Sequence, residues 1–370
     1  MTKVIAVLSS HTPSLFWFRL DMMKEFIVRG WKVYAIANEP SEQWGSQFAE
    51  HGIEYRQIEV QRNGLNPFSD LKTFCSLKKV LKEIRPEKIF TFQAKTVIYG
   101  ALAAKRLGIK EIYPLIAGMG SVFLSDSFKA KMIRFFLVSE YRMALKGCPA
   151  IFFQNQDDEE LFRKLRIVTN QKSIRINGSG VNLAKFQVVP LPQKLTFLCI
   201  SRLIRDKGVY EYLEACRRMK RIQPEVRCML VGPFDTNPSA LKPEELQSYI
   251  DEGTIEFFGE QADVRPFLAQ CSVYVLPSYR EGTPKTVLEA MATGRPVITT
   301  DAPGCRETVK DGVNGLLVPV RDVAAIVEKM QFFSEHEDKI EDMGKTGRQF
   351  VEERFDVKKV NHEICQTMQI

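Results

Sequence analysis

The feature that most constrains this chain is a strand that runs directly into a loop and then a helix, within residues 273–294. The apolar run Val273–Leu276 ends at Pro277, which indicates a short buried strand. The chain then turns at Gly282. A strand followed at once by a helix predicts a parallel sheet with helices packed on its faces, and ligands of such sheets bind at the carboxyl ends of the strands.

The helix of this segment has clear start and stop signals. Thr283 is suited to the N-cap and Pro284 to the first helical position, while Gly294 predicts the end. The helix N-terminus would present N–H groups and a partial positive charge to a phosphate. The candidate residues for binding this part of a ligand are Gly282, Thr283, Pro284, Lys285, Thr286 and Val287.

Two glutamates flank the predicted phosphate site, Glu281 in the loop and Glu289 inside the helix. Their spacing along the chain puts the carboxylates on the order of 10 Å apart, too far for a catalytic dyad. They suit two hydroxyl-rich groups on either side of a diphosphate, which is the shape of a sugar nucleotide. The alternative is a capped helix with two solvated glutamates.

A second polar segment, residues 201–208, directly follows the predicted strand Leu195–Ile200. Its Arg202 and Lys207 would lie at a strand end facing the same region as the loop of Glu281. Arg offers a planar fork for phosphate oxygens and Lys a point charge, so together they suit a diphosphate. Taken alone, such cations are more often those of a solvated loop.

Helix and strand patterns alternate along the whole chain. A length of 370 residues with 45% hydrophobic residues predicts two α/β domains, each with a parallel sheet and its own core. The predicted strands are 3–8, 32–37, 55–60, 88–92, 112–116, 150–154, 173–176, 195–200, 227–231, 254–258, 272–276, 296–300 and 316–318. Predicted helices include 16–29, 67–84, 96–107, 127–146 and a terminal one from about residue 350.

Further turns after strands supply candidate contacts to a bound nucleotide. Gly232 ends one predicted strand, and Glu260 and Gln261 follow another; an ordinary strand-to-helix turn is the alternative for each. Ser14 closes the loop after the first strand and is also a candidate. Residues 301–307 are expected to form an architectural loop beside the site.

The seven-residue gap between Glu281 and Glu289, with Gly-x-Pro after the first glutamate, resembles the retaining GT-B glycosyltransferases of family 4. The resemblance implies two Rossmann-like domains, residues 1–185 for the acceptor and 190–351 for the nucleotide sugar, with a helix at about 352–370 returning to the first. It also implies catalytic roles for Glu281, Arg202 and Lys207, a ribose contact for Glu289, and no metal or other cofactor besides the UDP-sugar co-substrate.

The amino-terminal half is similar to bacterial N-acetylgalactosaminyl transferases that extend lipid-linked oligosaccharides, in Ser9-Ser-His11, Phe18-Arg19 and residues 115–121. This implies transfer of an N-acetylhexosamine to a polyprenyl-diphosphate-linked saccharide, by an enzyme peripheral to the cytosolic face of a bacterial inner membrane. Two alternatives stay open: a sugar-nucleotide 2-epimerase of GT-B shape and a non-catalytic sugar-nucleotide-binding assembly factor.

Positive charge is concentrated in the amino-terminal half. Residues 1–190 hold 28 Lys and Arg against 17 Asp and Glu, although the whole chain carries only +7. Within the predicted helix 127–146, the cations Lys129, Lys131, Arg134, Arg142 and Lys146 alternate with aromatic residues. This helix is either a core-facing helix with a solvated basic face or an interfacial helix on anionic lipid, and the two are compatible.

Other classes of function lack their signatures. The chain has no D-x-D and no Walker A sequence, its four histidines are scattered, and its eight cysteines include no C-x-x-C pair. We therefore expect reduced core cysteines, no metal site and no nucleic-acid partner. The first predicted strand follows Met1 almost at once and no apolar run approaches ~20 residues, so we expect a cytoplasmic protein with neither signal peptide nor membrane span.

Overall fold

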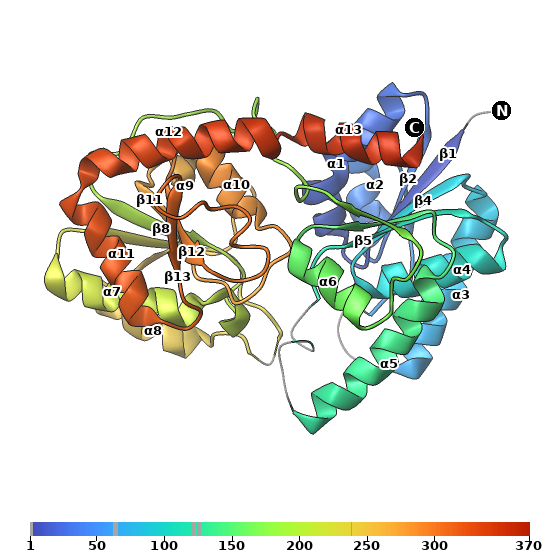
Figure 1. Cartoon of the computed structure of the whole chain (residues 1–370), viewed down its shortest axis with the longest axis horizontal. Helices are drawn as coiled ribbons and strands as arrows, with labels where there is room; N and C mark the ends of the chain where they lie inside the picture. The colour runs from blue at the N-terminus through green and yellow to red at the C-terminus, as the bar shows by residue number, and fades with distance from the viewer. Residues whose placement is uncertain (1–2, 62–65, 120–122, 124–126, 238) are drawn as a thin grey trace. The chain divides into compact units, whose positions relative to one another are not determined.

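The computed structural model describes residues 3–61, 66–119, 123, 127–237 and 239–370, which form two compact units (Figure 1). Unit 1 comprises residues 1–179 and 360–370, and unit 2 comprises residues 180–359. Residues 120 and 121, the last two of the motif at 115–121, lie outside the described residues. The two α/β units with parallel sheets confirm the predicted fold class.

Unit 1 is built on a seven-stranded parallel sheet with the order β3-β2-β1-β4-β5-β6-β7. Its central strands are apolar on both faces because helices cover both, as expected for a parallel sheet. The strands are β1 (Val4–Leu8), β2 (Lys32–Ala37), β3 (Glu54–Gln57), β4 (Lys88–Phe92), β5 (Glu111–Ile116), β6 (Ala150–Phe153) and β7 (Lys172–Arg175).

Two hydrophobic cores lie on the opposite faces of this sheet. One is formed with α1, α2 and the end of the chain in α13, and Figure 1 shows α13 beside these helices. The other is formed with α3, η1, α4, α5 and α6. The helices are α1 (Thr12–Val28), α2 (Ser41–Ala49), α3 (Pro67–Ile84), the π-helix η1 (Thr96–Gly100), α4 (Ala101–Arg106), α5 (Phe128–Leu145), α6 (Gln156–Lys164) and α13 (Val357–Met368).

Unit 2 has a six-stranded parallel sheet with the order β10-β9-β8-β11-β12-β13 and one continuous core. Its strands are β8 (Thr196–Ile200), β9 (Arg227–Val231), β10 (Glu256–Phe257), β11 (Val273–Leu276), β12 (Val297–Thr300) and β13 (Gly315–Val318). Its helices are the 3₁₀ turn η3 (Arg205–Lys207), α7 (Val209–Ile222), α8 (Pro243–Asp251), α9 (Arg265–Ala269), α10 (Lys285–Ala292), α11 (Val323–Glu335) and α12 (Glu337–Arg354).

The strand order of unit 2 reverses between β8 and β11, which lie side by side although 72 residues separate their ends. Strands added after β8 extend the sheet in one direction, and strands after β11 extend it in the other. In doubly wound sheets, ligands bind at the carboxyl ends of the strands next to such a reversal of strand order. Both polar segments singled out in the sequence, 201–208 and 277–284, occupy this switch point.

Several predicted boundaries were wrong. Helix α1 begins at Thr12, four residues before the predicted start, because the His11 ring accepts a hydrogen bond from the Ser14 N–H and Pro13 fits the first turn. The predicted helix 96–107 opens with a π-helical turn, and α2 was not predicted at all. Helix α2 is short and contributes only Trp44 and Phe48 to the core.

The predicted single terminal helix is interrupted between Arg354 and Val357. The Val181 N–H donates to the Phe355 carbonyl, and the Val357 N–H donates to the Val181 carbonyl. Because these backbone groups pair with Val181, they cannot continue a helix. Beyond this break, Val360, Ile364, Cys365 and Met368 join the core of unit 1.

All eight cysteines are free, and seven are buried. None of the described helices combines the length and the hydropathy that a bilayer crossing requires.

A pair of glycines tests how tightly the switch-point loops are packed. Gly208 and Gly253 have nearly the same left-handed backbone, with φ of 70° and 68°. A Cβ on Gly208 would lie 2.0 Å from the Pro277 carbonyl oxygen, whereas one on Gly253 would meet nothing within 4 Å. Gly253→Ala should therefore cost only the left-handed strain of about 1–2 kcal/mol, and Gly208→Ala should cost more than ~3 kcal/mol. Urea unfolding of both variants measures the difference, and equal losses would contradict the close packing.

Candidate active site

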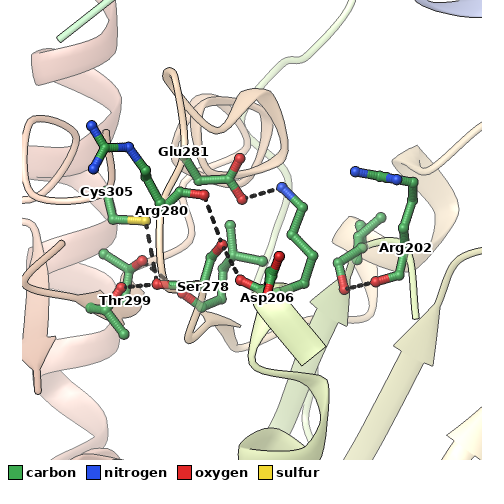
Figure 2. A network of polar contacts seen from close by, with 12 residues as sticks. Arg202, Asp206, Ser278, Arg280, Glu281, Thr299 and Cys305 are labelled. Atoms are coloured by element: carbon green, nitrogen blue, oxygen red, sulfur yellow. Dashed lines mark hydrogen bonds and ion pairs between the residues drawn. The ribbon is translucent and has the colours of Figure 1, made fainter. Parts of the chain in front are cut away.

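An ion pair joins the two loops at the switch point of unit 2. The Nζ of Lys207, at the end of η3, lies 2.5 Å from Oε1 of Glu281 in the loop after β11. Figure 2 shows the Glu281 carboxylate pointing toward this ammonium group. The two side chains are only 20% and 13% exposed, so the attraction is weakly screened by solvent. The structure thus brings together the two residues that the sequence assigned to the diphosphate and to the sugar.

Backbone contacts hold the same two loops together beside the ion pair. The Tyr279 N–H donates to the Asp206 carbonyl at 2.9 Å. The Ser278 hydroxyl donates to the same oxygen at 3.1 Å, and Figure 2 shows Ser278 and Asp206 next to each other. Gly208 lies directly against Pro277. The position of Lys207 relative to Glu281 is therefore fixed by the main chain as well as by charge.

The second predicted cation, Arg202, has its own carboxylate partner. Its Nη1 lies 2.8 Å from Oδ2 of Asp235 in the loop after β9, where the Asp235 side chain is 12% exposed and that of Arg202 is 40% exposed. Sequence reasoning missed Asp235, although it stands three residues beyond Gly232 at the end of a neighbouring strand. Asp235 orients a guanidinium that would otherwise be free to rotate in solvent.

The loop 301–307 packs against the loop of Glu281, in agreement with the architectural role predicted for it. The Glu281 N–H donates to the Pro303 carbonyl at 2.9 Å, and the Cys305 thiol lies 3.9 Å from the Ser278 carbonyl. Gly304 has φ of 82°, and a Cβ there would lie 2.2 Å from the Glu281 carbonyl. Only glycine allows this approach.

The loop of Glu281 is also held by a hydrogen bond between Tyr279 and Glu211, which the sequence did not predict. The hydroxyl of Tyr279 donates to Oε1 of Glu211, which is buried on α7. Burial, together with this hydrogen bond to the carboxylate, raises the pKa of Tyr279, so the phenol stays protonated and continues to donate. Arg321 lies over the other side of the ring, 4.7 Å from its centroid. No local sequence pattern links these three residues.

Helix α10 begins later than predicted. Its first residue is Lys285, and the N-cap is Pro284, whose backbone is extended and which has no side-chain cap; Thr283 is therefore not the N-cap. Val287 is fully buried in the core, and its N–H donates to the Pro284 carbonyl. The Val287 N–H is therefore already paired within the helix, and ligand binding by the rest of residues 282–286 stays a prediction.

Glu289 is the buried acid of the site. It is 8% exposed on α10, and burial raises its pKa to about 7. The positive charges of Lys285 and Lys185 act in the opposite direction, and the nearby Asp263 adds to the rise. At neutral pH the carboxyl group is therefore poised between its neutral and ionised forms, and a ligand that donates hydrogen bonds to it favours the ionised form.

The remaining predicted residues lie around this centre or outside unit 2. Gly232 has φ of 146°, and a Cβ on it would lie 1.8 Å from the Ser201 carbonyl, so it allows the β8 and β9 loops to touch. Glu260 and Gln261 are exposed after β10. Ser14 belongs to unit 1, where its hydroxyl lies 2.8 Å from the His11 ring nitrogen Nδ1. Nucleotide binding by these residues stays a prediction.

The described residues contain no group of three or more His, Cys, Asp or Glu side chains placed to hold a metal ion. Independence of a metal stays a prediction. The chemistry that the arrangement offers is electrostatic: two oriented cations, each in contact with a carboxylate, and a third carboxyl group, that of Glu289, which is ready to accept hydrogen bonds.

The raised pKa of Glu289 predicts a pH-dependent stability. A carboxyl group whose pKa rises from 4.5 to about 7 on folding stabilises the fold below pH 4.5, and this contribution is lost as the pH rises toward 7. Glu289→Gln stays neutral, so its melting temperature should exceed that of the wild type by at least ~2 °C near pH 8 and by less near pH 5. The exposed Glu260→Gln is the control, and the same shift at both pH values would contradict the burial argument.

The chain matches two family models. Residues 4–155 match "Glycosyl transferase 4-like" and residues 182–350 match "Glycosyl transferases group 1". The second range contains both switch-point loops, and the first lies within unit 1.

Curated relatives span nearly the whole chain. An N,N'-diacetylbacillosaminyl-diphospho-undecaprenol alpha-1,3-N-acetylgalactosaminyltransferase of Campylobacter jejuni is 30% identical over 90% of both chains. A UDP-Gal:alpha-D-GlcNAc-diphosphoundecaprenol alpha-1,3-galactosyltransferase of Escherichia coli is 26% identical over 70% of both.

Solved structures share the fold at lower identity. A sucrose-phosphate synthase of Thermosynechococcus elongatus superposes with a TM-score of 0.82 at 19% identity, covering 99% of this chain and 98% of its own. Anabaena HepE in complex with UDP and glucose superposes with a TM-score of 0.76 at 18% identity over the full length of both chains. With the C. jejuni relative and the two family matches, these findings establish that the chain belongs to the GT-B glycosyltransferases that combine a 4-like domain with a group 1 domain.

Proposed function

We propose that this glycosyltransferase transfers an N-acetylhexosamine, with retention of configuration, from a UDP-sugar to a polyprenyl-diphosphate-linked saccharide. The observation that carries the donor assignment is the Lys207–Glu281 ion pair at the switch point of unit 2. It joins a cation suited to a diphosphate with a carboxylate suited to sugar hydroxyls, so the two halves of a sugar nucleotide would be recognised by directly coupled side chains.

The relatives support the choice of donor and acceptor. The C. jejuni enzyme is named for an N-acetylgalactosaminyl transfer to a diphospho-undecaprenol sugar, and the E. coli enzyme for transfer from UDP-Gal to a sugar on the same kind of lipid. HepE was solved with UDP and glucose. The excess of cations in residues 1–190 fits an acceptor carried by an anionic bilayer, at the cytosolic face of a bacterial inner membrane.

The proposed roles follow from the contacts of each side chain. Arg202, oriented by Asp235, and Lys207, oriented by Glu281, neutralise the charge that develops on the departing diphosphate, and no metal is needed. Glu281 accepts hydrogen bonds from the donor sugar. Glu289 accepts them from the ribose and is drawn into its ionised form by doing so.

Retention requires no nucleophile from the protein in this scheme. The bond between the anomeric carbon and the diphosphate oxygen breaks, and the acceptor hydroxyl oxygen bonds to the same face of that carbon. The acceptor proton passes to the oxygen that has just departed. The cations therefore act on the leaving group and, through it, on the base that takes the proton.

A panel of UDP-sugars tests the function directly. The enzyme is incubated in EDTA with UDP-hexoses and UDP-N-acetylhexosamines, with and without a short-chain polyprenyl-diphosphate saccharide. We expect transfer of an N-acetylhexosamine only when the acceptor is present, and an unchanged anomeric configuration in the product by NMR. Epimerised sugar and free UDP without acceptor would assign a 2-epimerase instead, and an inverted product or a metal requirement would contradict the mechanism.

Substitution can test whether Arg202 and Lys207 act on the diphosphate or are merely the cations of a solvated loop. Arg202→Ala and Lys207→Ala should each lower kcat/KM by ~10²-fold or more, the loss expected for one partner of the transition-state charge. Arg205→Ala is the matched control, because Arg205 is an exposed cation of the same loop whose guanidinium lies over the Tyr210 ring, 4.3 Å from its centroid. Near-wild-type turnover of Arg202→Ala or Lys207→Ala at saturating donor would show that the substituted residue does not stabilise the departing diphosphate.

A further inference from the structure

Helix α5 of unit 1 has a second apolar face that points away from the core. Its core side is formed by small and large buried residues that include Val138 and Tyr141. On the opposite side lie large apolar side chains that are between 50% and 79% exposed: Phe128, Met132, Phe135, Phe136 and Met143. At 3.6 residues per turn these five positions fall within an arc of about 100°. A helix that is apolar on both sides is unusual for a surface position.

The exposed stripe is bordered by positive charge. Lys131 and Arg142 are exposed along one edge of it, and Lys146 is exposed at its end. The side chain of Lys129 lies outside the described residues. The acid of this helix, Glu140, does not oppose these cations, because it is half-buried and accepts a hydrogen bond from the Tyr99 hydroxyl at 2.9 Å. The surface around the stripe is therefore cationic.

Helix α3 adds a second element of the same kind. Phe68 and Leu71 in its first turns are 78% and 60% exposed. Between them, Asp70 forms an ion pair with Lys95 at 2.6 Å, just before η1, and Tyr99 in η1 donates to Glu140 of α5. The start of α3 and the middle of α5 are thus held to the same short helix. Along α3 the exposed residues that follow include four lysines, Lys72, Lys78, Lys79 and Lys82, together with Cys75 and one acid, Glu83.

We propose that the outer face of α5, together with the first turns of α3, inserts its aromatic, leucine and methionine side chains into an anionic lipid bilayer. The lysines and arginines beside them contact the lipid phosphates. This surface deepens the proposed function, on which it rests for the lipid-linked acceptor. The basic unit is then anchored by buried apolar area as well as by charge, in the manner of an interfacial amphipathic helix.

The charge of the surface favours a bilayer over a second copy of the chain. In a symmetric dimer through this face, each cationic border would meet another cationic border, and the like charges would repel. An anionic leaflet complements both parts of the surface, with phosphates for the lysines and acyl chains for the phenylalanines. Phenylalanine and methionine bury large apolar areas there with few polar atoms to desolvate.

Insertion differs from simple electrostatic adsorption in its response to salt. Adsorption through exposed cations disappears as the Debye length falls to ~3 Å at molar salt. Insertion of the stripe leaves a component of binding that salt does not remove, because apolar burial is not screened. The depth of residue 135 in the bilayer gives a second, independent readout.

The experiment uses the full chain with vesicles rich in phosphatidylglycerol and with pure phosphatidylcholine vesicles. Phe135→Trp reports insertion through quenching by lipids brominated along the acyl chain. Val28→Trp is the matched control, since Val28 is 81% exposed at the end of α1, outside the proposed surface. We expect flotation with the anionic vesicles, partial retention at high salt, and stronger quenching for Phe135→Trp than for Val28→Trp.

Two further variants separate the apolar and the ionic parts. Phe135→Ser combined with Phe136→Ser should weaken binding by ~10-fold or more at every salt concentration, as expected for the loss of two large apolar groups. Lys131→Gln combined with Lys146→Gln should weaken it only at low salt. Neither variant should change UDP affinity or turnover of a water-soluble acceptor, so the outcome does not depend on whether the proposed chemistry is correct.

Three results would overturn the proposal. Negligible binding to both kinds of vesicle would leave the surface without a lipid partner. Complete release by salt with equal quenching of the two tryptophan variants would show adsorption without insertion. A concentration-dependent dimer that is lost in the Phe135→Ser/Phe136→Ser variant would assign the surface to a second copy of the chain.

Discussion

The ion pair between Lys207 and Glu281 is the interaction on which the rest of the site depends. A partly buried cation or carboxylate without a partner would be costly, and here each satisfies the other across two loops that leave neighbouring strands. Its geometry is set by main-chain contacts, with Tyr279 bonded to Asp206 and Gly208 pressed against Pro277. The main chain of the two loops therefore determines where the charges of Lys207 and Glu281 lie. This is the preorganisation that electrostatic catalysis requires.

Neighbouring residues of the site are held in place by contacts from other strands and loops in the same way. Asp235 fixes Arg202 from the next strand, and the loop 301–307 holds the main chain of Glu281 through Pro303 and Gly304. Glu289 differs, because it is buried without a close cationic partner among the described residues, and its pKa is raised to about 7. Such a group lowers the stability of the fold at neutral pH in return for a carboxylate that a ligand can draw into its charged form. Sites of function commonly hold groups of this kind.

The sequence predicted elements that local patterns specify and missed those that depend on distant contacts. The bounds of β4, β9 and α3 agree with the predicted 88–92, 227–231 and 67–84, because short apolar runs and a proline after an N-cap asparagine define them locally. The switch-point loops were found because Arg202, Lys207, Glu281 and Glu289 stand at recognisable spacings. Asp235, Glu211 and Arg321 were missed because each reaches the site from a separate element. The sequence also did not decide which apolar residues of α5 face the core and which face solvent. Periodicity shows that a helix has apolar positions but not which neighbours cover them.

The central claim is that Lys207 and Glu281 act as one unit on the donor, and a double-mutant cycle measures this most directly. The value of kcat/KM for the UDP-sugar is compared among the wild type, Lys207→Ala, Glu281→Gln and the double variant. If the two side chains act through their ion pair, the double variant loses much less than the product of the two single losses, with a coupling of about 1 kcal/mol or more. Independent losses that multiply within error would show that the two residues serve the reaction separately, and would contradict the account.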